Sequence, residues 1–395
     1  MPVPLLSWCH KTLRVSHDDI YADRFDAEYC AKMTPQIERL VSESYQSVVL
    51  PEESKNRILD LGTSSIIYAS LHKSHFDYIT ICGKMFLEGL PCPRTIAGSN
   101  LLKGIIGKSV KQFTGIDLIK WGAIPVERDS AVPRTIRHLC NRIEALLKSD
   151  KPILIFPEIE MTINGNGYTI RTGRAYSGKV RKFAPALFSP AINASKGGKK
   201  VFIVPISVAY DFVAEEGYFS RLINADKMKK SENRLISVMG KLYYTFLESH
   251  FFYRMYRLGN GNIYIDTGDP IPVEPNTSKK ELAQRVQEET ARCYRVTMPA
   301  LVSYAIHKGA TSGDQLQKSV ERYSEILKAA NINFQPSTNL KEGIEGALDG
   351  LVRRKIISNH GAISVKKPDI ITYYANTIAH HFENAESRKY PGPNL

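Results

Sequence analysis

His72 and Asp77 are the two residues whose types and spacing best fit acid–base chemistry. They lie in the segment Leu71-His72-Lys-Ser-His-Phe-Asp77-Tyr, which follows a short β-branched run at Ser65–Ser70. An imidazole that donates one N–H to a carboxylate keeps its other nitrogen as a proton acceptor, so the pair can act as a general base toward a hydroxyl group. Alone the pattern is weak, because a carboxylate near the start of a helix also serves as a simple cap.

The offset of five residues restricts where the two groups can meet. On one continuous helix this offset turns the second side chain by about 140° around the axis, so the groups would not touch. They meet if His72 lies in a strand-to-helix loop and Asp77 lies in the first turn of the next helix. Ser74 and Asp77 then fit a capping box, with Ser74 at the N-cap. His75 is a rival base, but its offset of two from Asp77 ranks it below His72.

Strand-like and helix-like stretches alternate around this segment. Apolar and alternating runs predict strands, and apolar residues at three- and four-residue spacing predict helices. The expected strands are residues 65–70, 94–98, part of 118–126, 152–156, 201–209 and 262–267, and the expected helices are 26–44, 51–59, 76–87 and 132–148. Strands separated by helices over about 200 residues predict an α/β fold with a mixed central sheet flanked by helices.

The chain divides into three expected units. Residues 1–55 form an N-terminal helical segment, residues 56–270 form the α/β domain, and residues 271–395 form a C-terminal, mostly helical domain. The second boundary follows from the Gly- and Pro-rich run Gly268-Asp-Pro-Ile-Pro-Val-Glu-Pro, since both residue types interrupt regular structure.

The charge of the chain is concentrated in the middle unit. The net charge is +13 in total, with −3 in residues 1–55, +12 in 56–270 and +4 in 271–395. Residues 161–210 hold eight basic side chains and no acidic one. Such a surface attracts an anionic partner. Candidates are a phosphate-bearing substrate, an acidic carrier protein, anionic lipid or nucleic acid, and the alternative is a solvated basic face with no partner.

Several classes of protein do not fit the sequence. With 43% apolar and 24% charged residues, the composition is that of a globular protein. No apolar run approaches the about 20 residues of a transmembrane helix, and the N-terminus does not resemble a secretory signal. The six cysteines form no Cys-x-x-Cys pair, so we predict no metal site and reduced thiols.

Nucleic acid is not predicted as a partner, although the basic charge would suit it. The sequence contains no recognised DNA- or RNA-binding motif. One region, residues 340–365, has a helix-like stretch followed by a short apolar strand and is compatible with a winged-helix-like unit. Strong and steeply salt-dependent binding to DNA would favour that alternative.

Three further segments follow the His72-x4-Asp77 block in a familiar order. They are Gly122-Ala-Ile-Pro-Val-Glu-Arg128, Phe156-Pro-Glu158 and Val204-Pro205-Ile206. Together the four blocks resemble the pattern of the glycerolipid acyltransferases. The resemblance is strongest to the bacterial membrane glycerol-3-phosphate acyltransferases and the dihydroxyacetone-phosphate acyltransferases, and it covers roughly residues 60–382. Further shared segments are Ile96-Ala-Gly98-Ser-Asn100-Leu, Arg171-Thr-Gly-Arg174, Val296-Thr-Met-Pro-Ala-Leu301 and Tyr373-Tyr-Ala-Asn376-Thr-Ile-Ala-His380.

The resemblance implies transfer of an acyl group from a thioester to glycerol 3-phosphate. Residues 56–270 would be the catalytic domain, with His72 as general base and Asp77 as the group that orients it. The substrate would be bound by Arg128, Glu158, Arg171, Arg174, Asn100 and Lys179, with Glu158 either contacting the glycerol phosphate or ordering the site. No cofactor is expected, since acyl-CoA or acyl-ACP (acyl carrier protein) would be the co-substrate. The guanidinium fork of arginine suits a phosphate dianion.

Two blocks depart from the family pattern. In the second, Pro125 replaces the usual aromatic or aliphatic residue and Glu127 stands beside Arg128. The third departs further. The family runs Glu-Gly-x-Arg-Ser directly into Arg-Thr-Gly-Arg, whereas here Glu158 is followed by Ile159-Glu160-Met161-Thr162 and Asn164-Gly-Asn-Gly167 before Arg171. The acceptor therefore has alternatives, which are dihydroxyacetone phosphate or a lysophospholipid. A catalytically inactive lipid-binding relative is a further alternative.

The remaining expectations concern the oxyanion, the acyl chain and the membrane. Backbone N–H groups of Lys73 and Ser74 open a helix and are candidates for an oxyanion hole. Phe76, Ile79, Met85, Phe86 and Leu87 line an acyl groove or belong to the plain core. The aromatic run Leu242–Phe252 lies at a membrane interface or packs against the sheet. We expect a cytoplasmic protein, peripheral on the inner face of the cell membrane, with an anionic membrane surface as a partner.

Overall fold

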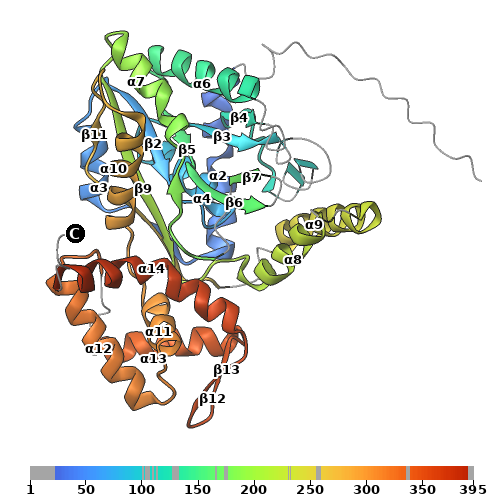
Figure 1. Cartoon of the computed structure of the whole chain (residues 1–395), viewed down its shortest axis with the longest axis vertical. Helices are drawn as coiled ribbons and strands as arrows, with labels where there is room; N and C mark the ends of the chain where they lie inside the picture. Colours follow the sequence, from blue (N-terminus) through green and yellow to red (C-terminus); the bar gives the residue numbers. More distant parts are fainter. Residues whose placement is uncertain are drawn as a thin grey trace, which may run out of the picture.

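The computed structural model describes most of the chain. Its described residues are 23–99, 102, 107–108, 111–112, 114–126, 133–164, 167–172, 177–229, 231, 233–254, 259–334 and 339–389. Figure 1 shows a twisted sheet with helices on both sides, a group of C-terminal helices below it and a helical hairpin that projects sideways.

The central sheet has eight strands and is mostly parallel. Its strands are β1 (Ser47–Val49), β2 (Ser65–Ser70), β3 (Arg94–Gly98), β4 (Ala123–Val126), β5 (Ile153–Ile155), β9 (Val201–Tyr210), β10 (Asn262–Thr267) and β11 (Ile271–Pro272). They lie in the order β1-β10-β9-β2-β5-β3-β4, with β11 paired to β9. The run from β9 to β4 is parallel, whereas β10 and β11 pair antiparallel with β9. Every residue of β2 is buried, as expected for a central strand covered on both faces.

Helices cover both faces of this sheet. They are α2 (Ala27–Ser44), α3 (Glu52–Leu59), α4 (Phe76–Leu87), α6 (Pro133–Lys148), α7 (Ser189–Lys196) and α10 (Lys279–Arg292). α6, α7 and α10 lie on one face, while α2 and α4 pack together on the other (Figure 1). Short 3-10 turns, η2 (Pro185–Phe188) and η3 (Glu216–Tyr218), precede α7 and α8.

The C-terminal part is mostly helical. It contains α11 (Met298–His307), α12 (Gly313–Ala329), α13 (Leu340–Arg353), the strand pair β12 (Ile357–Asn359) and β13 (Ile363–Val365), and α14 (Pro368–Lys389). Its buried apolar side chains and those of the sheet form one contiguous core. The predicted division into residues 1–55, 56–270 and 271–395 stays a prediction.

Two smaller units complete the described chain. A three-stranded sheet consists of β6 (Glu158–Asn164), β7 (Gly167–Thr172) and β8 (Lys182–Phe183) in the order β7-β6-β8. A helical hairpin consists of α8 (Phe219–Lys229) and α9 (Arg234–Arg254). In the described part of the chain no helix has the length and apolar character needed to cross a bilayer.

The predicted fold class is confirmed, and most boundaries agree within two residues. The strands at 65–70, 94–98 and 262–267 and the helix at 76–87 have the expected ends. Of the two alternatives for Leu242–Phe252, packing against the sheet is not found, because α9 packs on α8 instead. The region 340–365 is a helix followed by a two-stranded hairpin.

Candidate functional site

The candidate site lies at the carboxyl edge of the parallel strands. β2, β5 and β9 run parallel, so the residues that follow Ser70, Ile155 and Tyr210 emerge at the same edge. Ligands of open α/β sheets bind at this edge. Here the loop of residues 71–75 connects β2 to α4 and meets Glu158 after β5 and Glu215 after β9.

His72 and Asp77 form the predicted pair. Nδ1 of His72 lies 2.8 Å from Oδ2 of Asp77. Both residues are buried, and the imidazole stacks on Phe156 with 4.4 Å between ring centroids. An N–H at Nδ1 that donates to the carboxylate places the lone pair on Nε2, which is the arrangement of a general base. The rival His75 contacts Tyr78 with its ring, so the carboxylate is paired with His72 as predicted.

Asp77 is also the hydrogen-bond centre of the loop. Its Oδ2 accepts from the backbone N–H of Lys73 at 2.7 Å and of Ser74 at 3.0 Å, and its Oδ1 accepts from the hydroxyl of Tyr210 at 2.5 Å. The carboxyl group is fully buried, and this burial raises its pKa to about 6 despite these hydrogen bonds. Asp77 therefore fixes both the ring of His72 and the backbone that carries it.

One of the two bonds of the predicted capping box is present, from the N–H of Ser74 to Asp77, and the helix begins later than expected. Helix α4 starts at Phe76 with His75 at the N-cap, whereas the sequence placed Ser74 there. Ser74 Oγ accepts from the N–H of Phe76 at 3.1 Å, and Asp77 accepts from the N–H of Ser74. The boundary differs by one residue because the first turn is not yet regular helix, which is the usual uncertainty of helix ends.

Glu158 holds the loop from the side of β5. Its carboxylate is fully buried, and its two oxygens accept from the backbone N–H of His72 at 2.8 Å and of Arg181 at 3.1 Å. Of the two roles that the sequence left open, these bonds favour ordering of the site. A direct contact of Glu158 with substrate stays a prediction.

Glu215 holds the same loop from the side of β9. It is fully buried, and its two carboxylate oxygens accept from the hydroxyl of Ser74 at 2.7 Å and from the backbone N–H of His75 at 2.6 Å. The loop is thus held by three buried carboxylates, one each from α4 and from the segments after β5 and β9. This arrangement fixes the position of the His72 ring, because its backbone has little freedom to move.

Lys73 connects the loop to the segment before β8. Its side chain is buried, and its Nζ donates to the carbonyl of Gly178 at 2.9 Å. Burial lowers the pKa of this ammonium group. Gly178 has a positive φ of 77°, and a Cβ there would lie 2.1 Å from the carbonyl oxygen of Tyr373 in α14, so only glycine fits. The C-terminal helix α14 therefore packs directly on a segment that supports the site.

Truncation of Glu215 is expected to slow turnover without weakening substrate binding. Glu215→Ala leaves two buried donors without an acceptor, at a cost of about 1–3 kcal/mol each, and frees the loop. We expect kcat to fall by about tenfold or more with KM nearly unchanged, and Glu215→Gln to restore most of the activity. Steady-state kinetics together with thermal unfolding test this expectation.

Glu216 supplies a matched control for that experiment. Its carboxylate pairs with Arg354 at 2.7 Å and bonds the hydroxyl of Tyr374, away from the loop. Glu216→Ala should lower the melting temperature and leave kcat of the folded protein intact. An equal loss of kcat in both alanine variants would assign Glu215 a merely structural role.

The predicted phosphate-binding residues are only partly placed. Arg128, Arg174 and Asn100 lie outside the described residues. Lys179 is exposed, and its carbonyl oxygen lies 3.4 Å from Nζ of Lys73. Arg171 lies on β7, directly opposite Glu160 of β6 in the ladder. The roles of these residues in binding stay predictions.

The departure from the family pattern after Glu158 is a β-hairpin. β6 leaves the site at Glu158, and β7 returns so that Thr172 pairs with Ile159. The extra residues therefore extend outward, and Arg171 and Thr172 return beside Glu160 and Ile159. This geometry explains how the start of the block stays beside residues that closely follow Glu158 in the chain although the intervening sequence is longer.

The prediction that the N–H groups of Lys73 and Ser74 form an oxyanion hole is wrong. The N–H groups of Lys73 and Ser74 both donate to Asp77, and the next two in the loop donate to Glu215 and to Ser74 Oγ. These groups already satisfy buried carboxylate and hydroxyl oxygens, so they are not directed at a substrate oxygen.

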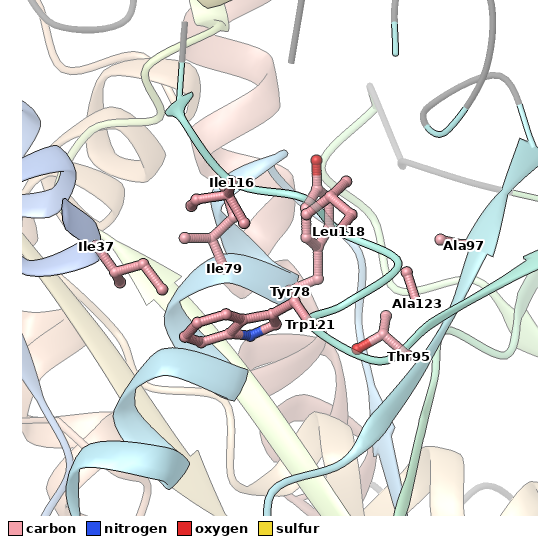
Figure 2. A pocket seen from close by; sticks show the side chains of 9 residues that line it. All are labelled: Ile37, Tyr78, Ile79, Thr95, Ala97, Ile116, Leu118, Trp121 and Ala123. Atoms are coloured by element: carbon pink, nitrogen blue, oxygen red, sulfur yellow. The ribbon is translucent and has the colours of Figure 1, made fainter. Parts of the chain in front are cut away.

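The predicted acyl groove is mostly core. Phe76 and Met85 are fully buried, Phe86 packs against Trp121 and Leu87 is exposed. Only Ile79 of the predicted set lines the apolar pocket of Figure 2, between α2, α4, β3 and β4. The pocket residues are Ile37, Tyr78, Ile79, Thr95, Ala97, Ile116, Leu118, Trp121 and Ala123. Tyr78 follows Asp77 in α4, and its hydroxyl lies 3.5 Å from Nδ1 of His75.

Tyr210, Glu215 and the buried side chain of Lys73 were not singled out from the sequence. Tyr210 and Glu215 lie more than 130 positions from Asp77, so their approach depends on the pairing of β9 with β2. Lys73 stands within the motif, but nothing local indicates that it is buried. Among the described residues, no group of three or more His, Cys, Asp or Glu side chains is arranged to hold a metal ion.

Comparison with known families agrees with this geometry. Residues 48–209 match the family model described as Acyltransferase. They include the four blocks that the sequence analysis identified, so the fold and the His–Asp site are those of an acyltransferase domain. The chain is similar to this family over residues 48–209, about two fifths of its length.

Over most of its length the chain is also similar to proteins named glycerol-3-phosphate acyltransferase. It is 26% identical over 403 residues to the one from Pseudoalteromonas atlantica, which covers 92% of this chain and 45% of the relative. It is 24% identical to that of Glaesserella parasuis, covering 86% of this chain and 42% of the relative. The relative from Pseudomonas syringae is 23% identical over 80% of this chain. The chain spans less than half the length of these relatives.

Proposed function

We propose that the protein is a glycerol-3-phosphate 1-O-acyltransferase that uses His72 as its general base. The main observation behind this proposal is the buried hydrogen bond of 2.8 Å between Nδ1 of His72 and Oδ2 of Asp77. It leaves Nε2 as the proton acceptor at the carboxyl edge of the sheet. The names of the similar proteins support glycerol 3-phosphate as the acceptor.

In the proposed reaction Nε2 of His72 takes the proton of the acceptor hydroxyl. The hydroxyl oxygen attacks the thioester carbonyl carbon, the carbon–sulfur bond breaks, and the imidazolium returns the proton to the leaving thiol. A positioned base contributes about 10²–10⁴-fold to such a step. Asp77 stabilises the imidazolium, and Glu158 and Glu215 keep the loop in place.

The acyl chain and the donor are part of the same proposal. Tyr78 and Ile79, on the helix that carries Asp77, line the small apolar pocket of Figure 2, and we assign the acyl chain to this side of α4. The donor is acyl-CoA or acyl-ACP, both of which are anionic and suit the basic middle segment. We place the enzyme peripherally on the cytoplasmic face of an anionic membrane, where such substrates are used.

A thiol-release assay tests this function. We expect a long-chain acyl thioester to release its thiol when glycerol 3-phosphate is added, and much more slowly without it. Parallel reactions with dihydroxyacetone phosphate and with a lysophospholipid identify the acceptor. No release with any acceptor, from either acyl-CoA or acyl-ACP, would contradict the proposal and favour an inactive lipid-binding relative.

A further inference from the structure

Helix α9 exposes an apolar face that the rest of the described chain does not cover. Leu235, Leu242 and Phe246 are 70%, 65% and 61% exposed. Met239 lies between them, so the four residues follow the spacing of one helical stripe. Ile236, Val238 and Tyr243 widen the stripe and are also exposed. A contiguous apolar surface of this kind indicates a binding partner.

The opposite face of α9 binds α8. A Cβ at Gly240 would lie 2.3 Å from the backbone nitrogen of Lys229, which shows how closely the two helices cross. Leu247 packs with Leu222 and Ala225 in a small core that is separate from the main one. The hairpin is thus held together from within, and its outer apolar face takes no part in its folding.

The base of the hairpin is joined to the candidate site. Glu215, which accepts hydrogen bonds from the loop of residues 71–75, precedes the first residue of α8 by only four positions. Phe219 packs on Tyr373 of α14, and Ser220 bonds the carboxylate of Asp369. Figure 1 shows α8 and α9 extending sideways from this attachment.

Charge identifies the kind of surface that the hairpin fits. Residues 219–254 contain seven Lys or Arg and three Asp or Glu. Arg234 and Lys241 are exposed on α9 itself, and Arg221 and Lys227 are exposed on α8. A stripe of Leu, Phe and Met flanked by cations is the composition of helices that lie in the interface of anionic bilayers. A second copy of the chain would instead bring two like-charged hairpins together.

We propose that the α8–α9 hairpin docks the protein on an anionic lipid bilayer, with the apolar stripe of α9 immersed in the interface. This inference rests on the proposed function. Because the base of the hairpin adjoins Glu215, docking through the hairpin would hold the site near the surface where acyl chains and lipid products reside. The immersed residues are Leu235, Met239, Leu242 and Phe246.

Co-sedimentation with vesicles tests the docking surface. Wild-type protein should pellet with vesicles of phosphatidylglycerol and phosphatidylcholine, and less with phosphatidylcholine alone. The double variant Leu242→Ser/Phe246→Ser should lose about tenfold or more of its partition, because two large side chains leave the apolar layer. Lys241→Glu should weaken binding to the anionic vesicles only. Leu59→Ser, which removes an exposed leucine elsewhere, is the matched control and should bind like the wild type.

Three results would overturn the inference. The first is absence of pelleting by the wild type, and the second is equal pelleting of the double variant. The third is a wild-type dimer in analytical ultracentrifugation that the double variant dissociates, without vesicle binding, since a second copy would then cover the face.

Failure of the proposed function can be distinguished from failure of the docking surface. His72→Ala should pellet like the wild type, and the double variant should retain transfer with a soluble short-chain thioester. Hairpin-dependent pelleting by a wild type that transfers no acyl group would refute the enzyme and leave the docking surface standing.

Discussion

His72→Ala is expected to lower the rate of acyl transfer by at least about 10²–10⁴-fold, the contribution of a positioned base. The loss should appear in kcat, because the imidazole takes up the proton in the transition state. The fold should survive, since Glu158 binds the backbone N–H of residue 72 and Asp77 keeps three of its hydrogen bonds. Thiol release and thermal unfolding, measured on the same preparation, separate the two effects.

His75→Ala is the matched control for this experiment. His75 is as buried as His72 and lies in the same loop, but its ring contacts Tyr78, and its bond to Glu215 comes from the backbone. We expect this variant to keep activity within about tenfold of the wild type, because it retains the base and its orienting carboxylate. Full activity of His72→Ala, or a larger loss in His75→Ala, would move the base away from His72.

The sequence predicted the fold because its strong signals are local. The apolar strands at 65–70 and 262–267 and the helix at 76–87 are each specified by their own periodicity. The His72–Asp77 pair was predictable for the same reason, since a strand-to-helix turn brings residues five apart into contact. The β6–β7 hairpin was missed because Asn164-Gly-Asn-Gly167 was interpreted as a departure from a family block, although Gly and Asn flanked by alternating residues also predict a hairpin turn.

The rest of the site depends on long-range pairing. Glu215 and Tyr210 reach the loop only because β9 lies parallel to β2, with Ile206 opposite Ser70. No local pattern indicates which of 40 acidic residues will be buried against backbone N–H groups. The oxyanion prediction was wrong for a related reason, because Asp77, Glu215 and Ser74 use the N–H groups that a free helix start would present.

α9 shows the limit of sequence patterns in the other direction. Its aromatic and aliphatic residues fit burial against a sheet as well as they fit a membrane interface, and both were left open. The structure excludes the sheet, because α9 touches α8 and leaves Leu235 and Leu242 exposed. Which face a helix buries depends on where its neighbours lie, and composition alone does not contain that information.

Asp77→Asn is expected to abolish most activity without destabilising the protein at neutral pH. Burial raises the pKa of Asp77 from 3.8 to about 6, so the fold favours the protonated acid. The stability from this group is fully present below pH 3.8 and is lost as the pH rises through about 6. At pH 7 the ionised carboxylate then costs about 3 kcal/mol, which an amide avoids. Asparagine does not stabilise the imidazolium, so kcat should fall by about a hundredfold or more.

The pH profile distinguishes this role from a structural one. Wild-type kcat/KM should decrease as the pH falls through about 6, because protonated Asp77 no longer stabilises a charged His72. Asp211→Asn is the matched control: burial also raises the pKa of Asp211 to about 6, and its partner is Asn262, outside the site. Both variants should unfold at or above the wild-type temperature at pH 7, and only Asp77→Asn should be inactive. If Asp77→Asn instead unfolds well below the wild type at pH 7, the hydrogen bonds of the carboxylate outweigh the cost of burying its charge.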